Sequence, residues 1–224
     1  MSEPEEVSYD DMRREMVETI SLHALVASEV TGKHELDDTV MGAMADVPRH
    51  EFVPVELRDT AYVDSPLPIG HGKTISQPFM CALMTDLLEL ESDDKVLEIG
   101  TGLGYGAAVL AEIAEEVYSV EILSELADEA QRRLRAQNFD VTTRIGDGSY
   151  GWADQAPFDK MIVTAAPERI PQGLLEQLRP GGRMVIPIGV EDPQELVMVE
   201  KDNDDSIEIT KIMPVVFAPL VLSH

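Results

Sequence analysis

Two helices are predicted near the start of the chain from the spacing of apolar side chains. Between Asp10 and about Val30, apolar residues recur on one helical face, at Met12, Met16, Ile20 and Leu22–Leu25. A second, short helix is expected from Asp37 to Ala45, stopped by Pro48. Residues 1–9 are polar and carry no periodic pattern, so we expect them to be disordered.

The stretch VPRHEFVPVELRDTAYVDSPLPIGHGK, residues 47–73, contains four prolines and shows no clear period. Prolines and glycines end regular elements and mark turns. We therefore expect an ordered but irregular segment. It runs directly into GKTISQPFM at residues 72–80, where a helix is expected after Pro78.

From Lys95 onward, short apolar runs alternate with amphipathic stretches. The strand-like runs are KVLEIG, VYSVEI, VTTRIGDG, KMIVTAA and RMVIPIG, and the helical stretches are YGAAVLAEIA, LSELADEAQRRLRAQ and PQGLLEQLRPGG, the last closed by Pro-Gly-Gly. This alternation predicts an α/β fold, a parallel sheet with helices on both faces. Two later runs, ELVMVEK and SIEITKIMPVVFAPL, are joined by the short acidic turn DNDD, which favours an antiparallel pair.

The composition fits a soluble protein with one sizeable core. Of the 224 residues, 44% are hydrophobic, and the single cysteine, Cys81, excludes an intrachain disulfide. No apolar run approaches the roughly 18 residues of a membrane span. The beginning of the sequence, MSEPEEVSYDD, is unlike a signal peptide. We expect a cytoplasmic monomer.

The charge is strongly negative and is spread along the whole chain. Forty-three acidic and 17 basic residues give a formal net charge of −26. Such a charge argues against nucleic acid and against an anionic membrane surface, because both are bound through clustered Lys and Arg. A solvated acidic surface is the simplest interpretation, and its extent suggests a protein adapted to high salt.

The stretch LEIGTGLGYG is the strongest chemical signal, because it follows a predicted strand and opens a predicted helix. Gly100, Gly102 and Gly104 allow a sharp turn and a close approach to a ligand. Gly102, Gly104 and Ala107 also fit the loose dinucleotide pattern G-x-G-x-x-[GA]. Glu121 at the end of the next strand could hold a ribose diol in either an NAD enzyme or a methyltransferase.

One strand later, GDGS places an acid at the same edge of the sheet. Asp147 there can accept a hydrogen bond from an adenine amino group, with the adenine between the second and third strands of the predicted sheet. This arrangement favours S-adenosyl-L-methionine as the cofactor. NAD remains the alternative cofactor. Taken alone, Asp147 is equally well explained as a turn residue.

With these motifs in place, the sequence resembles the protein-L-isoaspartate (D-aspartate) O-methyltransferase family. The matching blocks cover almost everything from Val47 to Leu220, in order: VPRHEFVP, AYVDSPLPIG, TISQPFM, VLEIGTGLGYGAAVLAEIA, VYSVE, GDGSYGW, APFDKMIVTAA, LLEQLRPGGRMVIPIG and FAPL. The resemblance implies a Rossmann-like sheet of seven strands, S-adenosyl-L-methionine as methyl donor, and isoaspartyl residues of damaged proteins as acceptors. The methyl ester closes to a succinimide, which opens partly to normal aspartate.

The resemblance also assigns roles and regions. Ser76 falls on the catalytic candidate at the acceptor carboxylate, and the cofactor-binding positions fall on Thr74, Ile75, Gln77, Glu98, Gly100, Gly102, Gly104, Glu121, Asp147 and Gly148. Residues 10–80 would form a helical and irregular segment on the acceptor side, and residues 81–224 the methyltransferase core. Three positions depart from the family pattern: Lys73 replaces a Gln, Leu103 a Ser and Gly106 a Gln.

The implied chemistry asks little of the protein. A carboxylate has a pKa near 4 and is ionised at neutral pH, so no general base is needed. Ser76 could orient the acceptor oxygen, or it could be only a helix N-cap with Pro78 at the second helical position. Lys73 could attract the acceptor, or it could be an ordinary solvated lysine. The five histidines show no metal-ligand spacing, so no metal is expected.

Two rival functions stay open. One is a methyltransferase of the same fold with a changed acceptor, motivated by Lys73, Leu103 and Gly106. The other, from a different class, is a protein that keeps the cofactor-binding fold but has little turnover.

The distributed negative charge predicts a salt-dependent stability. The Debye length is about 3 Å at molar salt and about 10 Å at 0.1 M, so repulsion among the carboxylates grows as salt is removed. We expect the melting temperature to fall when KCl is lowered across this range, as measured by circular dichroism. A chain that stays folded and monomeric at low salt, with no loss of stability, would contradict adaptation to high salt.

Overall fold

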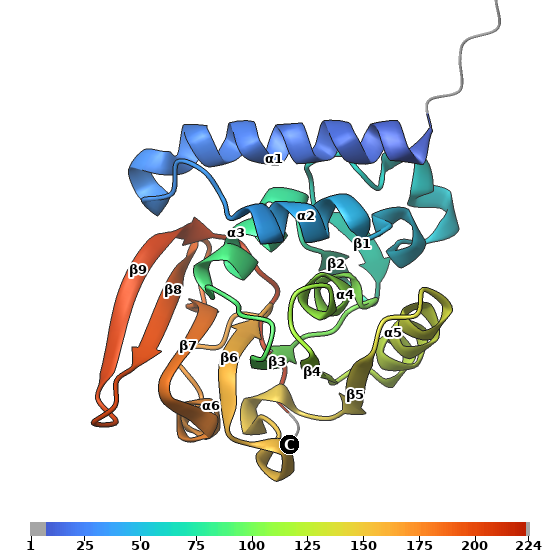
Figure 1. The fold of residues 1–224 in the computed structure, drawn as a ribbon. Helices are drawn as coiled ribbons and strands as arrows, with labels where there is room; N and C mark the ends of the chain where they lie inside the picture. Colours follow the sequence, from blue (N-terminus) through green and yellow to red (C-terminus); the bar gives the residue numbers. More distant parts are fainter. Residues whose placement is uncertain (1–7, 223–224) are drawn as a thin grey trace, which may run out of the picture.

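A computed structural model describes residues 8–222. Helix α1 (Tyr9–Thr31) crosses the top of the molecule above α2 (Asp38–Asp46) and α3 (Pro78–Leu87) (Figure 1). Both predicted N-terminal helices are confirmed to within one residue at each end. The Ser8 hydroxyl caps α1 by accepting a hydrogen bond from the Asp11 amide at 3.2 Å.

The predicted disorder of residues 1–9 needs a correction at its end. Ser8 caps α1 and Tyr9 begins it, because the serine hydroxyl satisfies an amide of the first helical turn that would otherwise lack a partner. Residues 1–7 lie outside the part of the chain that the structure describes.

The proline-rich segment after α2 is ordered and irregular, as predicted. It contains two 3₁₀ helices, η1 (Arg49–Phe52) and η2 (Val55–Thr60). A small antiparallel hairpin that the sequence did not predict follows them, formed by β1 (Leu67–Gly70) and β2 (Lys73–Ile75). Strands this short give too few positions for an alternating pattern to be visible.

The main sheet has seven strands, five of them parallel, which confirms the predicted fold class. The strands are β3 (Lys95–Ile99), β4 (Glu116–Glu121), β5 (Val141–Ile145), β6 (Phe158–Val163), β7 (Leu178–Ile188), β8 (Gln194–Lys201) and β9 (Ile207–Val215). Their order is β5-β4-β3-β6-β7-β8-β9, with β8 and β9 antiparallel as predicted. The chain builds outward from β3 to β5 and then returns to the other side of β3, so the strand order reverses between β3 and β6.

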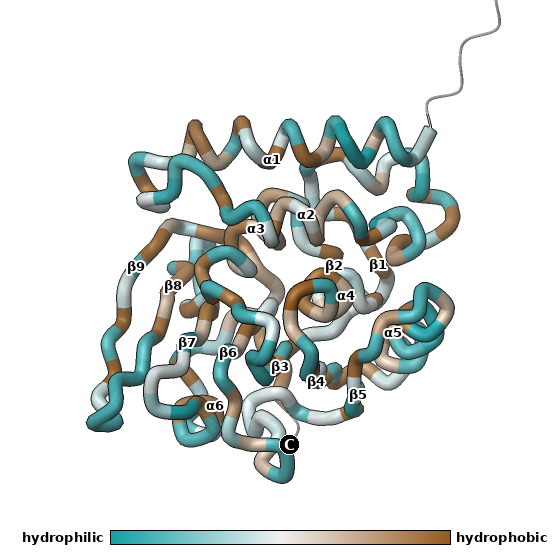
Figure 2. The backbone as a smooth tube through the Cα atoms, viewed as in Figure 1, coloured by the Kyte–Doolittle hydropathy of each residue, from teal (hydrophilic) through white to brown (hydrophobic). Residues whose placement is uncertain are grey.

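Helices cover both faces of this sheet. On one face α4 (Tyr105–Ala111) and α5 (Ser124–Ala136) share a hydrophobic core with the three N-terminal helices. On the other face α6 (Gln172–Gln177) and the short turns η3 (Gly148–Tyr150) and η4 (Ala153–Gln155) cover a second core. Figure 2 shows hydrophobic positions along α3, α4 and the strands, whereas the outer turns of α5 and the tip of the β8–β9 hairpin are hydrophilic.

Two sequence-based boundaries differ in the structure. Helix α6 ends at Gln177, and the Pro-Gly-Gly run that was expected to close it lies in β7, where the pairing with β6 is irregular. Gly181 has φ +77 there, which suits the irregular register. The predicted division between residues 80 and 81 falls inside α3, so that helix is shared by the two proposed regions.

Candidate functional site

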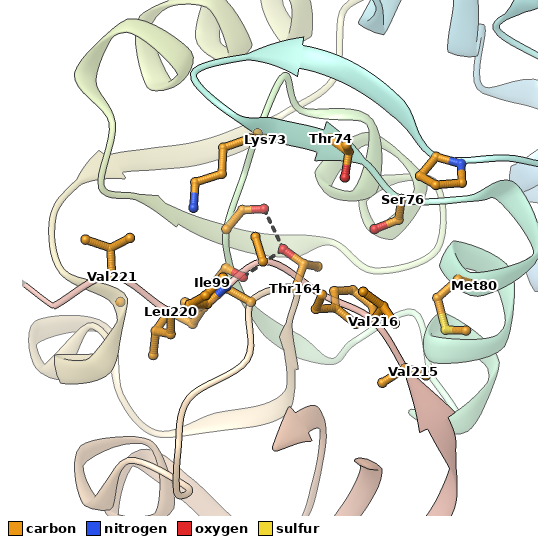
Figure 3. Close-up of a pocket in the computed structure, with 18 of the residues that line it drawn as sticks. Lys73, Thr74, Ser76, Met80, Ile99, Thr164, Val215, Val216, Leu220 and Val221 are labelled. Atoms are coloured by element: carbon orange, nitrogen blue, oxygen red, sulfur yellow. Dashed lines mark hydrogen bonds between the residues drawn. The ribbon is translucent and has the colours of Figure 1, made fainter. Parts of the chain in front are cut away.

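A cavity of about 440 Å³ opens where the strand order reverses. Its floor comes from the carboxyl ends of β3, β4 and β6, and its roof from the β1–β2 hairpin and the loop before α3. Its side comes from the end of β9 and the chain that follows. In Figure 3, Lys73 and Ser76 point into this space from above, opposite Ile99 and Thr164. Crevices at such switch points are the usual ligand sites of open α/β sheets.

Seven of the eleven predicted site residues line this cavity. They are Thr74, Ser76, Gln77, Gly100, Gly102, Glu121 and Gly148. Ile75 and Glu98 instead line a smaller adjoining cavity of about 60 Å³, which Thr74, Ser76, Gly100 and Gly102 share. Gly104 and Asp147 line neither of these two cavities.

The glycines of the loop after β3 have distinct roles. Gly100 and Gly102 have φ +98 and +56, and a Cβ at Gly100 would strike the Thr164 side chain. A Cβ at Gly148 would likewise strike Ile99. Gly104 has φ +96, begins α4 as its N-cap and packs against Leu134 of α5. Three glycines thus keep the cavity wall free of side chains, and Gly104 shapes the helix start.

The two acids at the strand ends are held in fixed orientations. Glu121 is buried at the end of β4, where its carboxylate accepts hydrogen bonds from the amides of Gly102 at 2.9 Å and Leu123 at 3.0 Å. Asp147 caps η3 and accepts from both the amide and the hydroxyl of Ser149, at 2.9 and 2.7 Å. Asp147 therefore does serve as a turn residue, and its adenine-binding role stays a prediction.

Glu98 is a buried carboxyl on β3. Ser119 donates a 2.5 Å hydrogen bond to it, and the Thr101 hydroxyl lies 2.6 Å from the Ser119 oxygen. Burial, which is the largest cause, and the nearby Glu121 together raise the pKa of Glu98 to about 7, against the opposing effect of the Ser119 hydrogen bond. A Cβ at Gly106 would lie 2.5 Å from Glu98 Oε1, so the missing side chain at position 106 leaves room for this carboxyl orientation.

Ser76 lies in the loop between β2 and α3, and it is not the helix cap. The N-cap residue is Gln77, and Pro78 occupies the first helical position. The Gln77 side chain forms no capping hydrogen bond. The amide of Phe79 is instead bound by Asp64 Oδ1 at 2.7 Å. The capping interpretation of Ser76 is therefore wrong, and its hydroxyl faces the cavity.

Lys73 is the single basic residue among the described residues that line the large cavity, as Glu121 is the single acidic one. Its ammonium group points into the cavity (Figure 3) and forms no ion pair or hydrogen bond within residues 8–222. Both interpretations of Lys73, attraction of the acceptor and ordinary solvation, stay predictions.

The sequence reasoning missed two parts of the site. Residues 213–221 form the side wall, held by backbone hydrogen bonds from Ala166 to Ala218 at 2.8 Å and from Leu220 to Ala166 at 2.9 Å. The matching FAPL block gave the signal that could have revealed this wall. Arg49, which is fully buried, hydrogen-bonds the Ser76 carbonyl at 2.7 Å, and no local pattern marks such a contact.

Packing or side-chain contacts account for Cys81, His50 and His23. Burial raises the pKa of the Cys81 thiol to about 12, which suits a packing role. His50 lies 2.7 Å from the Tyr62 hydroxyl, and His23 pairs with Asp64. Within residues 8–222, no three His, Cys, Asp or Glu side chains gather as a metal site requires. No helix in the same range is long and apolar enough to cross a membrane.

Comparisons with known proteins agree with this geometry. A family model described as Protein-L-isoaspartate(D-aspartate) O-methyltransferase (PCMT) matches residues 21–224. The Protein-L-isoaspartate O-methyltransferase 1 of Polaromonas sp. is 52% identical over 221 residues, covering 98% of this chain and 92% of the relative. The Protein-L-isoaspartate O-methyltransferase 2 of Syntrophobacter fumaroxidans is 51% identical over 220 residues, covering 96% and 88%.

Solved structures share the fold. One titled protein-L-isoaspartate O-methyltransferase aligns with a TM-score of 0.80 and 26% identity over 92% of this chain, which spans 65% of that structure's chain. Another, from Plasmodium falciparum, is titled a putative protein-L-isoaspartate O-methyltransferase in complex with S-adenosyl-L-homocysteine. It aligns with a TM-score of 0.76 and 22% identity, over 96% of this chain and 99% of that one.

The raised pKa of Glu98 predicts a pH-dependent stability. Between pH 4.5 and 7 the folded chain keeps a proton that the unfolded chain loses, so this contribution is complete at low pH and disappears as the pH rises through about 7. Each pKa unit corresponds to about 1.4 kcal/mol. In urea unfolding without added cofactor, the free energy of unfolding of the wild type should fall by a few kcal/mol relative to Glu98→Gln over this range.

The control is Glu112→Gln, which removes one exposed carboxyl beside α4. If the free energies of unfolding of the wild type and of Glu98→Gln differ by the same amount at every pH, the raised pKa of Glu98 is contradicted.

Proposed function

The chain belongs to the protein-L-isoaspartate(D-aspartate) O-methyltransferase family, and from this premise we propose how its cavity performs the reaction. The protein is an S-adenosyl-L-methionine-dependent methyltransferase that esterifies the carboxylate of L-isoaspartyl and D-aspartyl residues in damaged proteins, which initiates their repair. The observation that carries the residue assignment is that the glycine loop, Glu121 and the Ser76 hydroxyl all face one cavity.

The residues of the cavity fit the cofactor. Gly100, Gly102 and Gly148 leave a wall that added side chains would narrow or distort, as a nucleoside against the backbone requires. The Glu121 carboxylate lies at this wall as the acceptor for a ribose diol, with Asp147 beyond Gly148 on the adenine side. When bound, S-adenosyl-L-methionine supplies an electrophilic methyl group on a sulfonium.

The methionine end would lie toward the smaller cavity. Thr74, Ile75 and Glu98 line that space, whereas Gln77, the N-cap of α3, lines the larger cavity. A carboxyl with a pKa near 7 can be ionised at little cost beside an ammonium group, because a neighbouring opposite charge lowers its pKa. This arrangement supports the assignment of Glu98 to the amino-acid part of the cofactor.

On the acceptor side, the chain needs only to bind, orient and exclude water. Ser76 donates a hydrogen bond to one oxygen of the acceptor carboxylate and leaves the other oxygen free to attack in line. Met80, Val215 and Val216 supply apolar walls beside Ser76. Alignment and exclusion of water can together remove several kcal/mol of the barrier to displacement. Residues 10–80 then form the acceptor side, and residues 81–224 the core that holds the cofactor.

The cellular setting completes the proposal. The chain acts as a cytoplasmic monomer on isoaspartyl-containing proteins and peptides, without nucleic acid or membrane partners. The formal net charge of −26 supports the expected lack of nucleic-acid and anionic-membrane partners, because it disfavours association with polyanions.

One assay tests the proposed function. The protein is incubated at high salt with methyl-labelled S-adenosyl-L-methionine and with paired peptides that differ only in isoaspartyl or normal aspartyl linkage. Alkali-labile label on the isoaspartyl peptide alone is expected. Label on neither peptide, with the cofactor bound in calorimetry, would indicate a binding protein, and label on another acceptor would indicate a changed specificity.

Removing the Ser76 hydroxyl should impair transfer far more than cofactor binding. A hydrogen bond to a charged group contributes about 1.5–3 kcal/mol, so Ser76→Ala should lower kcat/KM for the isoaspartyl peptide about 10- to 100-fold. The dissociation constant of S-adenosyl-L-methionine, measured by calorimetry, should change little. Ser92→Ala, an exposed serine before β3, is the control. Equal losses in transfer and in cofactor binding would mean that Ser76 is structural.

Lys73 should contribute to binding of the anionic acceptor. Neutralising it in Lys73→Gln should raise KM for the isoaspartyl peptide by about 3- to 10-fold, on the order of 1 kcal/mol, with little change in kcat. The matched control, Lys211→Gln, removes the same charge from an exposed site on β9. Equal KM values for the two variants would exclude this role, and a weaker cofactor affinity in Lys73→Gln alone would place the lysine at the cofactor's carboxylate.

A further inference from the structure

Arg49 is the largest fully buried side chain in the described part of the molecule, and it lies behind the Ser76 loop. From the start of η1, its guanidinium donates to the carbonyl of Ala61 through Nε at 2.8 Å and to the carbonyl of Ser76 through Nη2 at 2.7 Å. The guanidinium carbon also lies 4.6 Å from the ring centroid of Tyr105 on α4. One side chain therefore joins the proline-rich segment, the Ser76 loop and the glycine-loop helix.

This burial is costly and is not offset by an ion pair. No carboxylate of residues 8–222 lies within ion-pair distance of Arg49, and its Nη1 has no hydrogen-bond partner in that range. Removing a cation from water costs several kcal/mol, and a well-packed apolar residue of similar size often stabilises a protein more. Stability alone therefore does not account for an arginine here.

An acid holds the same loop from its other end. The buried side chain of Asp64 accepts hydrogen bonds from the Gln77 side-chain amide at 2.9 Å and from the Phe79 amide at 2.7 Å, and it pairs with His23 on α1. The Arg49 guanidinium thus binds the carbonyl of Ser76, and the Asp64 carboxylate binds the N–H groups of Gln77 and Phe79 that follow it. Both ends of residues 76–79 are fixed by charged groups that are themselves buried.

We propose that Arg49 is a positioning residue for methyl transfer. By holding the Ser76 carbonyl it fixes the orientation of that peptide unit, and so the direction in which the Ser76 hydroxyl enters the cavity. Asp64 provides the opposing restraint. The inference rests on the proposed role of Ser76 at the acceptor carboxylate. A displacement of about 1 Å at a reacting group can lower the rate about 100-fold, so fixing the Ser76 loop in place should have a measurable effect on the rate of methyl transfer.

The first measurement does not depend on catalysis. Amide hydrogen exchange of the segment 73–80 is compared in the wild type, in Arg49→Lys and Arg49→Gln, and in Arg58→Gln, without added cofactor and at high salt. Arg58 is the matched control, because it lies on η2 and pairs with Glu51 rather than with the Ser76 loop. Faster exchange of the segment in the two Arg49 variants alone is expected. Unchanged exchange in folded Arg49 variants would overturn the proposal.

The second measurement is a double-variant cycle in the peptide assay. Arg49→Lys should lower kcat about tenfold or more and leave the affinity for S-adenosyl-L-methionine within about threefold of wild type. If Arg49 acts through Ser76, the double variant Arg49→Lys/Ser76→Ala should lose no more activity than the more damaging single variant. Losses that multiply, or a kcat equal to that of Arg58→Gln, would overturn the proposal.

The remaining outcomes are also decisive. If neither Arg49 variant folds at high salt, as judged by circular dichroism, Arg49 is a folding residue and the proposal is wrong. If the wild type fails to label the isoaspartyl peptide, the proposed function fails, and hydrogen exchange still decides whether Arg49 restrains the loop.

Discussion

The reversal of strand order beside β3 is the constraint on which the site depends. Because β4 and β6 flank β3, the loops that follow β3 and β6 leave the sheet in opposite directions and open a crevice between them. The glycine loop, Glu121 and Thr164 all meet there because parallel strands present their carboxyl ends at one edge. The N-terminal segment then adds a roof, which carries the only hydroxyl assigned to the acceptor.

Much of this arrangement could be predicted from local sequence. The strands of the sheet are short apolar runs, and the helices between them have clear amphipathic periods, so their order followed directly. The glycine loop was placed correctly because only a few sequences allow a strand to turn so sharply into a helix. The assignment of Ser76 came from the family resemblance, and the structure places its hydroxyl at the cavity.

The rest depends on contacts between distant parts of the chain. Arg49 contacts Ser76 across 27 positions, and no periodicity records such a pair. Gly104 shares its sequence signal with Gly100 and Gly102, yet it packs against α5 instead of lining the cavity. Likewise, Asp64 and not Ser76 accepts a hydrogen bond from the first turn of α3. Asp64 and Phe79 are 15 positions apart and meet only in the folded chain.

Charge has different roles at the surface and inside. The surface carries a large excess of acid, whereas a basic side chain lines the cavity at Lys73 and another lies buried behind it at Arg49. A few oriented cations close to the reacting group can outweigh a diffuse negative field, because their interactions are short and poorly screened. A strongly acidic protein and an anionic substrate are therefore compatible.

A crystal structure of the chain with S-adenosyl-L-homocysteine would show whether one cavity aligns cofactor and acceptor. We expect the ribose hydroxyls at the Glu121 carboxylate and the sulfur turned toward the Ser76 hydroxyl, inside the cavity that both residues line. A ligand bound outside this cavity, or one whose sulfur is turned away from Ser76, would contradict this expectation.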